Sequence, residues 1–242
     1  KPFALEGSQE TMSCYSWTVG NDAPLYVNGV TFQNEGSFHH SNWFVVPEDV
    51  YPGDDGFWPC AERDFNDISA GLGGTVLFAQ STQAQQESME FTEGAVIRIP
   101  ARSKLVAGVH LLNLGPDPRE TAGWMTLDAI HPGLVDTILS PMMLAYRDLD
   151  IPALSRQAFV GACPAGDMGA VELHYALPHY HRAGVEARLS FVEKGEPTVV
   201  VDQVGFGGQP MGRSFDPPLE FERFSGVEFQ CTYDNPHDET LE

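Results

Sequence analysis

The sequence predicts an all-β protein of the sandwich or jelly-roll type. Its 242 residues include 24 Gly and 18 Pro, which interrupt the chain too often for long helices. Between them lie short segments that are rich in β-branched and aromatic residues and are typical of strands. These segments are residues 43–46, 75–80, 95–99, 105–112, 187–192, 198–201 and 227–233. One short helix is expected from Leu134 to Tyr146, although Pro141 interrupts it.

Two linker-like segments predict a domain boundary near residue 133. They are residues 115–120 (GPDPRE) and residues 131–133 (HPG). A chain of this length is long enough for two ordinary domains. We therefore expect an N-terminal β-sandwich over residues 1–133 and a C-terminal one over residues 134–242.

Charge and hydropathy exclude several classes of partner. The chain carries 34 Asp and Glu against 13 Lys and Arg, a formal net charge of −21. Such an acidic protein repels nucleic acid and anionic lipid. The sequence contains no run of 18 apolar residues, so no membrane span is expected. The first residues, KPFA, hold no apolar secretory core, so a signal peptide has been removed or never existed.

The four cysteines are Cys14, Cys60, Cys163 and Cys231. None lies in a C-x-x-C pair, which argues against a thiolate zinc site. An even number at wide spacing favours disulfides in an oxidising compartment. The alternative is four buried thiols in a cytosolic protein.

Five of the eight histidines lie in patterns that suit a metal. His179 and His181 form a His-x-His motif. Residues two apart on a strand point to the same face, so both imidazoles could reach one ion. The adjacent His39 and His40 can reach one ion only where a bulge or strand end distorts the backbone. His110 lies in an apolar strand and becomes a candidate ligand only beside other ligands. Each pattern also has a structural reading, as half-exposed or core histidines.

The order of the motifs along the chain resembles one family. The motifs are TMSCYSW at Cys14, FHHSNWFVVPE at His39, FWPC at Cys60, GVHLLN at His110, IPALSRQAFVGAC at Cys163, PHYHRAG at His179 and FQCTYDNP at Cys231. Together they resemble the copper type II ascorbate-dependent monooxygenases, which include peptidylglycine α-hydroxylating monooxygenase and dopamine β-monooxygenase. The resemblance extends over nearly the whole chain.

The resemblance implies two tandem antiparallel β-sandwich domains of jelly-roll type, each with one copper ion. His39, His40 and His110 would hold the first copper, which supplies an electron. His179 and His181 would hold the second copper, where O2 and a small organic substrate meet and a C–H bond is hydroxylated. Ascorbate or a similar reductant is the expected co-substrate. An extracellular or periplasmic location follows, with the signal peptide removed.

The resemblance also implies a disulfide between Cys14 and Cys60. In the family the second copper takes a methionine from a Glu-Met-Cys motif downstream of the Cys231 strand, and this sequence ends at Glu242 before that point. Met211 and Met168 are internal stand-ins, but neither follows that motif. Cys163 and Cys231 would pair with residues beyond this sequence, so they are free or paired with each other.

The amidating members carry an arginine two residues before His-x-His, where this chain has Leu177. Leucine cannot pair with a carboxylate, which predicts against peptide amidation. Two other functions stay open: a non-catalytic copper-binding protein for storage or delivery, and a β-sandwich interaction domain whose histidines are incidental.

Overall fold

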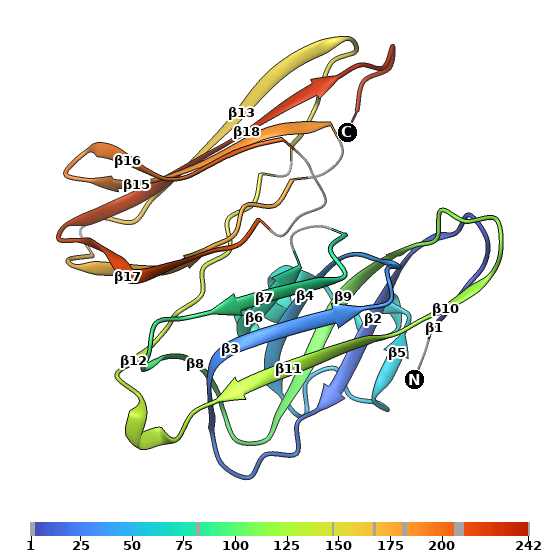
Figure 1. Ribbon diagram of the computed structural model, residues 1–242, viewed down its shortest axis with the longest axis horizontal. Coiled ribbons are helices and arrows are strands. Elements are labelled where there is room, and N and C mark those ends of the chain that lie inside the picture. Colours follow the sequence, from blue (N-terminus) through green and yellow to red (C-terminus); the bar gives the residue numbers. More distant parts are fainter. Residues whose placement is uncertain are drawn as a thin grey trace. The chain divides into compact units, whose positions relative to one another are not determined.

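A computed structural model of the chain describes residues 3–80, 83–146, 148–166, 168–180, 183–205 and 211–241. The chain divides into two compact units, residues 1–143 and 144–242 (Figure 1). Regular structure in both units is mostly β-strand, which confirms the predicted all-β fold. The boundary expected near residue 133 falls inside unit 1, because Thr137–Ile138 pairs there with Ala95–Val96. No described helix is long and apolar enough to cross a membrane.

Unit 1 contains twelve of the strands in the described part of the chain. They are β1 (Phe3–Leu5), β2 (Glu10–Thr18), β3 (Leu25–Asn34), β4 (Phe38–Pro47), β5 (Gly56–Trp58), β6 (Thr75–Gln80), β7 (Gln86–Glu90), β8 (Ala95–Ile99), β9 (Ser103–Leu112), β10 (Arg119–Thr121), β11 (Gly123–Ala129) and β12 (Thr137–Ile138). Its short helices are η1 (Cys60–Arg63), α1 (Asp67–Gly73) and η2 (Pro132–Leu134), of which η1 and η2 are 3-10 turns.

The strands of unit 1 form two five-stranded sheets and the short pair β1–β10. One sheet has the order β5-β2-β9-β4-β6. In the other, β3 pairs with β7, β8 and β11, and β12 adds to β8. Phe32 of β3 joins the sheets, since its ring lies 5.6 Å from Trp43 of β4 and 6.1 Å from Phe78 of β6 between centroids. Unit 1 is therefore β-sandwich-like, with a core of inward-facing aromatic and aliphatic side chains.

The outer face of the β9 sheet is partly covered by the segment that leads into α1. Gly108 of β9 permits this approach, since a Cβ there would lie 3.2 Å from both Phe65 and Asp67. The Asn42 amide of β4 donates a hydrogen bond of 2.7 Å to the Asp67 carboxylate. His110 lies two residues beyond Gly108, so strand alternation places it on the same outer face.

Unit 2 contains the strands β13 (Ser155–Pro164), β14 (Val171–Ala176), β15 (Gly184–Glu193), β16 (Glu196–Val204), β17 (Arg213–Phe221) and β18 (Phe224–Asn235). Four of them form an antiparallel sheet in the order β13-β18-β15-β16, and β14 pairs with β17. Phe191 of β15 packs against Phe221 and Phe224, with ring centroids 4.9 and 5.0 Å apart. These rings belong to a hydrophobic cluster that includes residues of both sheets, so the β14–β17 pair covers one face of the larger sheet.

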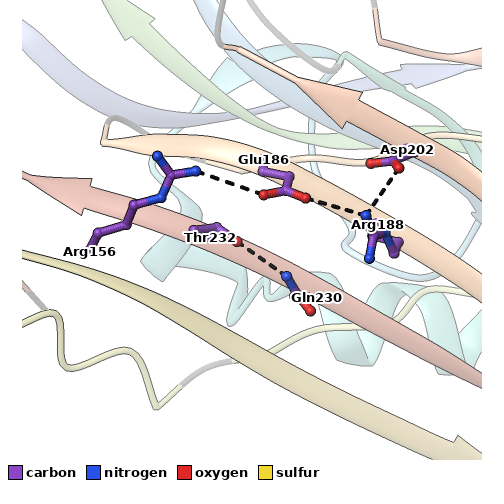
Figure 2. A network of polar contacts seen from close by, with 6 residues as sticks. All are labelled: Arg156, Glu186, Arg188, Asp202, Gln230 and Thr232. Carbon is purple, nitrogen blue, oxygen red and sulfur yellow. Dashed lines mark hydrogen bonds and ion pairs between the residues drawn. The ribbon is translucent and has the colours of Figure 1, made fainter.

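A row of polar side chains lies on the larger sheet of unit 2 (Figure 2). The Glu186 carboxylate lies 3.9 Å from Arg156 and 3.5 Å from Arg188, and Arg188 lies 3.1 Å from Asp202. Ion pairs at this degree of exposure contribute little stability individually. Alternation along β15 places this row opposite Ala187, which lies in a hydrophobic cluster, so the sheet has one polar and one apolar face.

The seven segments predicted as strands all lie within strands, because each combines β-branched or aromatic residues with nearby turn residues. The helix expected from Leu134 to Tyr146 was wrong. Only Leu134 belongs to a helical turn, η2, and Thr137–Ile138 joins β8 as a parallel strand. Most residues after Ile138 are exposed, so a helix there would gain little from packing, and Pro141 disfavours one.

Candidate metal centre

Three imidazoles gather on the outer face of the β9 sheet in unit 1. His39, His40 and His110 each offer one ring nitrogen, and these atoms all lie within 4.8 Å of one another. The ring centroids lie 4.9 to 5.3 Å apart. They are the one group of three or more His, Cys, Asp or Glu ligands that the described residues bring together.

A bulge in β4 makes this arrangement possible. Phe38 pairs with Leu111 and His40 pairs with His110, so β4 advances two residues while β9 advances one. His39 is the extra residue, and both histidines of the doublet are half-buried. A bulge re-aims side chains that would otherwise point to opposite faces. The distortion that the His-His doublet required is therefore confirmed.

Strand pairing fixes the third histidine. His110 lies between Val109 and Leu111, which are fully buried on the core side, so its own side chain points outward. It stands directly opposite His40 on β4, and His40 Nε2 lies 3.0 Å from His110 Nδ1. Two nitrogens bound to one ion at about 2 Å each lie at most about 4 Å apart. The His40–His110 pair already meets that limit.

Glu10 orients His110. Its carboxylate Oε1 lies 2.9 Å from His110 Nε2 and accepts a hydrogen bond from Nε2–H. In this tautomer Nδ1 of His110 accepts a hydrogen bond from His40 Nε2–H, a contact that a metal ion bound by both rings would replace. A carboxylate behind a histidine is the usual support of a metal-binding imidazole, since it fixes the ring and raises its basicity.

Gln83 contacts the remaining imidazole. Its side-chain amide nitrogen Nε2 lies 2.6 Å from His39 Nδ1. With the amide nitrogen facing His39, that nitrogen donates to Nδ1, and the ring proton lies on Nε2. With the amide turned by 180°, Nδ1–H donates to the amide oxygen, and Nε2 of His39 keeps a lone pair for a metal. Sequence reasoning missed both Glu10 and Gln83. Each lies on a segment distant in sequence from its histidine, and only the register of the folded sheet brings them together.

The disulfide between Cys14 and Cys60 is confirmed, with Cα atoms 5.0 Å apart. Cys14 of β2 pairs with Gly108 of β9, and Met12 of β2 pairs with His110. The disulfide thus ties the strand that carries Glu10 to η1. Strand β2 is the direct neighbour of β9, which carries His110.

The His-x-His motif has a different environment. A shared face would require a strand, but β14 ends at Ala176, and the described residues 177–180 lie outside any strand. Pro178 cannot donate a ladder hydrogen bond, which favours the end of pairing. His179 is exposed, and His181 lies outside the described residues. Tyr180 between them is buried, and its hydroxyl donates to the carbonyl of Gly205.

The two stand-in methionines differ in burial. Met211 is buried in the hydrophobic cluster that includes Tyr180, whereas Met168 is 63% exposed. Leu177, two residues before His179, is half-buried. Among the described residues, the structure assembles no three-residue metal group around His179.

The other cysteines of unit 2 do not pair with each other. On β13 and β18, Cys163 pairs with Val227 while Cys231 pairs with Phe159, so the two thiols lie four register positions apart. Cys163 is exposed and Cys231 is half-buried. Burial raises the pKa of the Cys231 thiol above its ordinary value. Of the two arrangements considered, free or mutually paired, the structure shows free thiols.

Two further histidines have structural roles. His174 is buried in β14, with Nε2 3.3 Å from a Glu172 carboxylate oxygen. His131 is exposed, and its Nδ1 accepts a hydrogen bond of 3.1 Å from the Gly133 amide at the start of η2. Neither joins the group at His39.

Comparison with known proteins does not assign a family. No protein-family model matches the sequence, and no curated protein matches it. Among solved structures, a Bacteroides ovatus protein assigned as an alpha-L-fucosidase has 10% identity at a TM-score of 0.25; the match covers 95% of this chain and 34% of that one. The PBSX exported protein XepA has 10% identity at a TM-score of 0.28, with 96% and 84% covered. Likenesses at these scores carry no argument about fold or function.

Proposed function

We propose that the protein binds copper at His39, His40 and His110 and acts as a copper-dependent monooxygenase. The observation that carries the proposal is the bulge that turns two adjacent imidazoles toward a third, with their nitrogens within 4.8 Å. Three imidazoles without a thiolate suit copper, which binds nitrogen sites more tightly than the other first-row divalent ions. Copper at this site would supply one-electron redox chemistry.

The roles of the surrounding residues follow from their contacts. Glu10 accepts a hydrogen bond from His110 Nε2–H and so leaves Nδ1 as the nitrogen that can bind a metal. Gln83 holds the ring of His39 in place. The net charge of −21 favours cations near the protein surface. These contacts support a preformed cation site on a sheet that a disulfide braces.

For the second site, the proposal rests on the family resemblance. His179 and His181 are proposed to hold a second copper at which O2 and a small organic substrate react, with an ascorbate-like reductant. The two β-sandwich units are proposed to be the two jelly-roll domains of that family. Leu177 cannot pair with a carboxylate, so the proposed substrate is not a peptide with a free carboxyl end.

A disulfide persists in oxidising compartments, so we place the protein outside the cytosol.

One observation favours the second function, a non-catalytic copper carrier on the same scaffold. His179 is exposed and lies outside any strand, whereas the group at His39 is complete.

Oxygen consumption separates the two functions. Copper-loaded protein given ascorbate and candidate small amines or alcohols should consume O2 and release a hydroxylated product. His179→Ala should abolish this turnover while leaving copper bound at the first site. The matched control is His131→Asn, which replaces an exposed histidine outside both sites. His131 is the N-cap of η2, and asparagine is also a favoured N-cap residue, so the turn should be preserved. Copper binding without O2 consumption would favour the carrier, and full turnover by His179→Ala would refute the role given to His179.

A further inference from the structure

A second carboxylate lies close to the candidate metal centre, on the same outer face of the β9 sheet. Two residues from His110 along β9, Gly108 occupies the next position on this face, and Asn42 of β4 pairs with it. Asp67 of α1 lies against that pair. Its Oδ2 accepts a 2.7 Å hydrogen bond from the Asn42 amide, and its Oδ1 lies 3.2 Å from the place of a Cβ on Gly108. Positions two apart on a strand are separated by about 7 Å, so Oδ1 lies within about 10 Å of His110 Cβ.

The segment that carries this carboxylate is held against the sheet. The ring of Phe65 lies over Gly108, 3.2 Å from the place of its Cβ. The segment begins at Cys60, and its disulfide partner Cys14 pairs with Gly108 across β2 and β9. A side chain at Gly108 would push the segment away from the sheet. Glycine at this position therefore keeps Asp67 close to the imidazoles.

The charge of Asp67 acts on its surroundings, because the residue is half-buried. Burial raises the pKa of the Tyr51 phenol, and the nearby Asp67 carboxylate raises it further. The effective dielectric constant near a protein surface is about 20. Two unit charges about 10 Å apart then interact strongly enough to change an equilibrium about tenfold. A cation held by the three imidazoles would feel an effect of this size.

We propose that Asp67 determines which oxidation state of copper the centre prefers, because its carboxylate stabilises the doubly charged ion more than the singly charged one. Imidazoles are neutral ligands, so copper(II) keeps one more unit of charge than copper(I). A site that favours copper(II) makes bound copper(I) a stronger electron donor, which suits the one-electron chemistry proposed above. The inference rests on the proposed copper binding at His39, His40 and His110. It does not depend on the second site or on the monooxygenase reaction.

Copper affinities measured separately for the two oxidation states test this role. The reference protein is the full chain with His179→Ala, so that the proposed second site does not contribute. Adding Asp67→Asn removes the charge but keeps an oxygen that can accept the hydrogen bond from Asn42. Against competing chelators, we expect its copper(II) affinity to fall about tenfold more than its copper(I) affinity, and the reduction potential to rise. Asp67→Glu restores a carboxylate and should keep the ratio of the two affinities close to that of the reference.

Asp55→Asn is the matched control. The Asp55 carboxylate also accepts hydrogen bonds from a strand of this sheet, at 2.8 Å from the Thr18 amide and 3.1 Å from the Thr18 hydroxyl. Thr18 lies six residues along β2 from Met12, the partner of His110, which is about 20 Å. This variant should leave both affinities unchanged.

The ratio of the two affinities separates a charge effect from a structural one. Loss of packing or of a hydrogen bond at Asp67 would weaken both oxidation states alike. An unchanged ratio in Asp67→Asn, whether both affinities fall together or neither falls, would therefore overturn the proposal. No copper bound by the reference protein would refute the proposed metal centre itself, whereas copper bound with an unchanged ratio would refute only the role of Asp67.

Discussion

His40 and His110 stand directly opposite each other on neighbouring antiparallel strands, with His40 Nε2 3.0 Å from His110 Nδ1. Directly opposed residues are the closest side-chain neighbours in a sheet, so their relative position is set by backbone pairing. Only His39 depends on a local irregularity, the bulge after Phe38. The candidate centre is therefore built mainly from regular structure, which favours a preformed site.

Glu10→Gln should weaken metal binding without destabilising the fold. The variant removes the charged acceptor of the hydrogen bond from His110 Nε2–H, and loss of such a supporting carboxylate costs about 10- to 100-fold in metal affinity. The Glu10 side chain is 60% exposed, so the free energy of unfolding should change by less than about 0.5 kcal/mol. Competition with a copper chelator measures the affinity. Glu93→Gln, at an exposed carboxylate in a loop of the same unit, serves as the control, and an equal affinity in both variants would contradict the role of Glu10.

Removing the disulfide should lower both stability and metal affinity. Cys14 and Cys60 are separated by 46 residues, and a loop of this size corresponds to about 4 kcal/mol of unfolding free energy in the chain-entropy model. Cys14→Ala with Cys60→Ala should therefore unfold at a lower denaturant concentration than wild type and bind copper more weakly. Cys163→Ser, at an exposed free thiol, should show neither effect. Wild-type copper affinity in the double variant would show that the bond does not brace the site.

The two free thiols should differ in reactivity. Cys163 is exposed, whereas burial raises the pKa of the Cys231 thiol and lowers its thiolate fraction. At pH 8, iodoacetamide should modify Cys163 faster than Cys231, because the thiolate is the reactive form and the accessible thiol meets the reagent more readily. Peptide mapping after timed alkylation gives the two rates. Equal rates would mean that the β18 thiol is more accessible than described.

The stability of unit 2 should fall at alkaline pH. Burial, with Cys231 and Tyr180 nearby, raises the pKa of Tyr233 from 10.0 to about 12. The folded state therefore keeps the phenol proton at a pH where the unfolded chain has lost it. The stabilisation is complete below pH 10 and is lost as the pH rises from 10 to 12, with a slope of up to about 1.4 kcal/mol per pH unit.

Tyr233→Phe tests this alkaline dependence. Denaturant unfolding between pH 9 and about pH 12 should show a shallower loss of stability in the variant than in wild type, because phenylalanine has no proton to lose. Tyr146→Phe, at a 42% exposed tyrosine, should leave the wild-type slope unchanged. Identical slopes in Tyr233→Phe and wild type would exclude Tyr233 as the source.

Much of the fold could be predicted from local sequence. The seven strand segments were found because each has the composition of a strand, and the His39–His40 doublet could be linked in advance to a bulge. Glu10 and Gln83 could not be found, because their contacts depend on register between segments far apart in the chain. The environment of His179 could not be predicted either, because His-x-His spacing does not show where strand pairing ends, and β14 ends at Ala176. The helix expected over residues 134–146 was wrong because Thr137–Ile138 pairs with β8 instead.

Copper stoichiometry in a ligand variant tests the central claim most directly. Metal-free wild type, His131→Asn and the double variant His40→Ala, His110→Ala would be equilibrated with copper and freed of unbound metal, and the bound ions counted per chain. The double variant should bind one ion fewer than the other two proteins, because it keeps only one of three imidazoles that now lie within 4.8 Å. The same copper content in all three proteins, or no copper bound by wild type, would contradict the proposed metal centre.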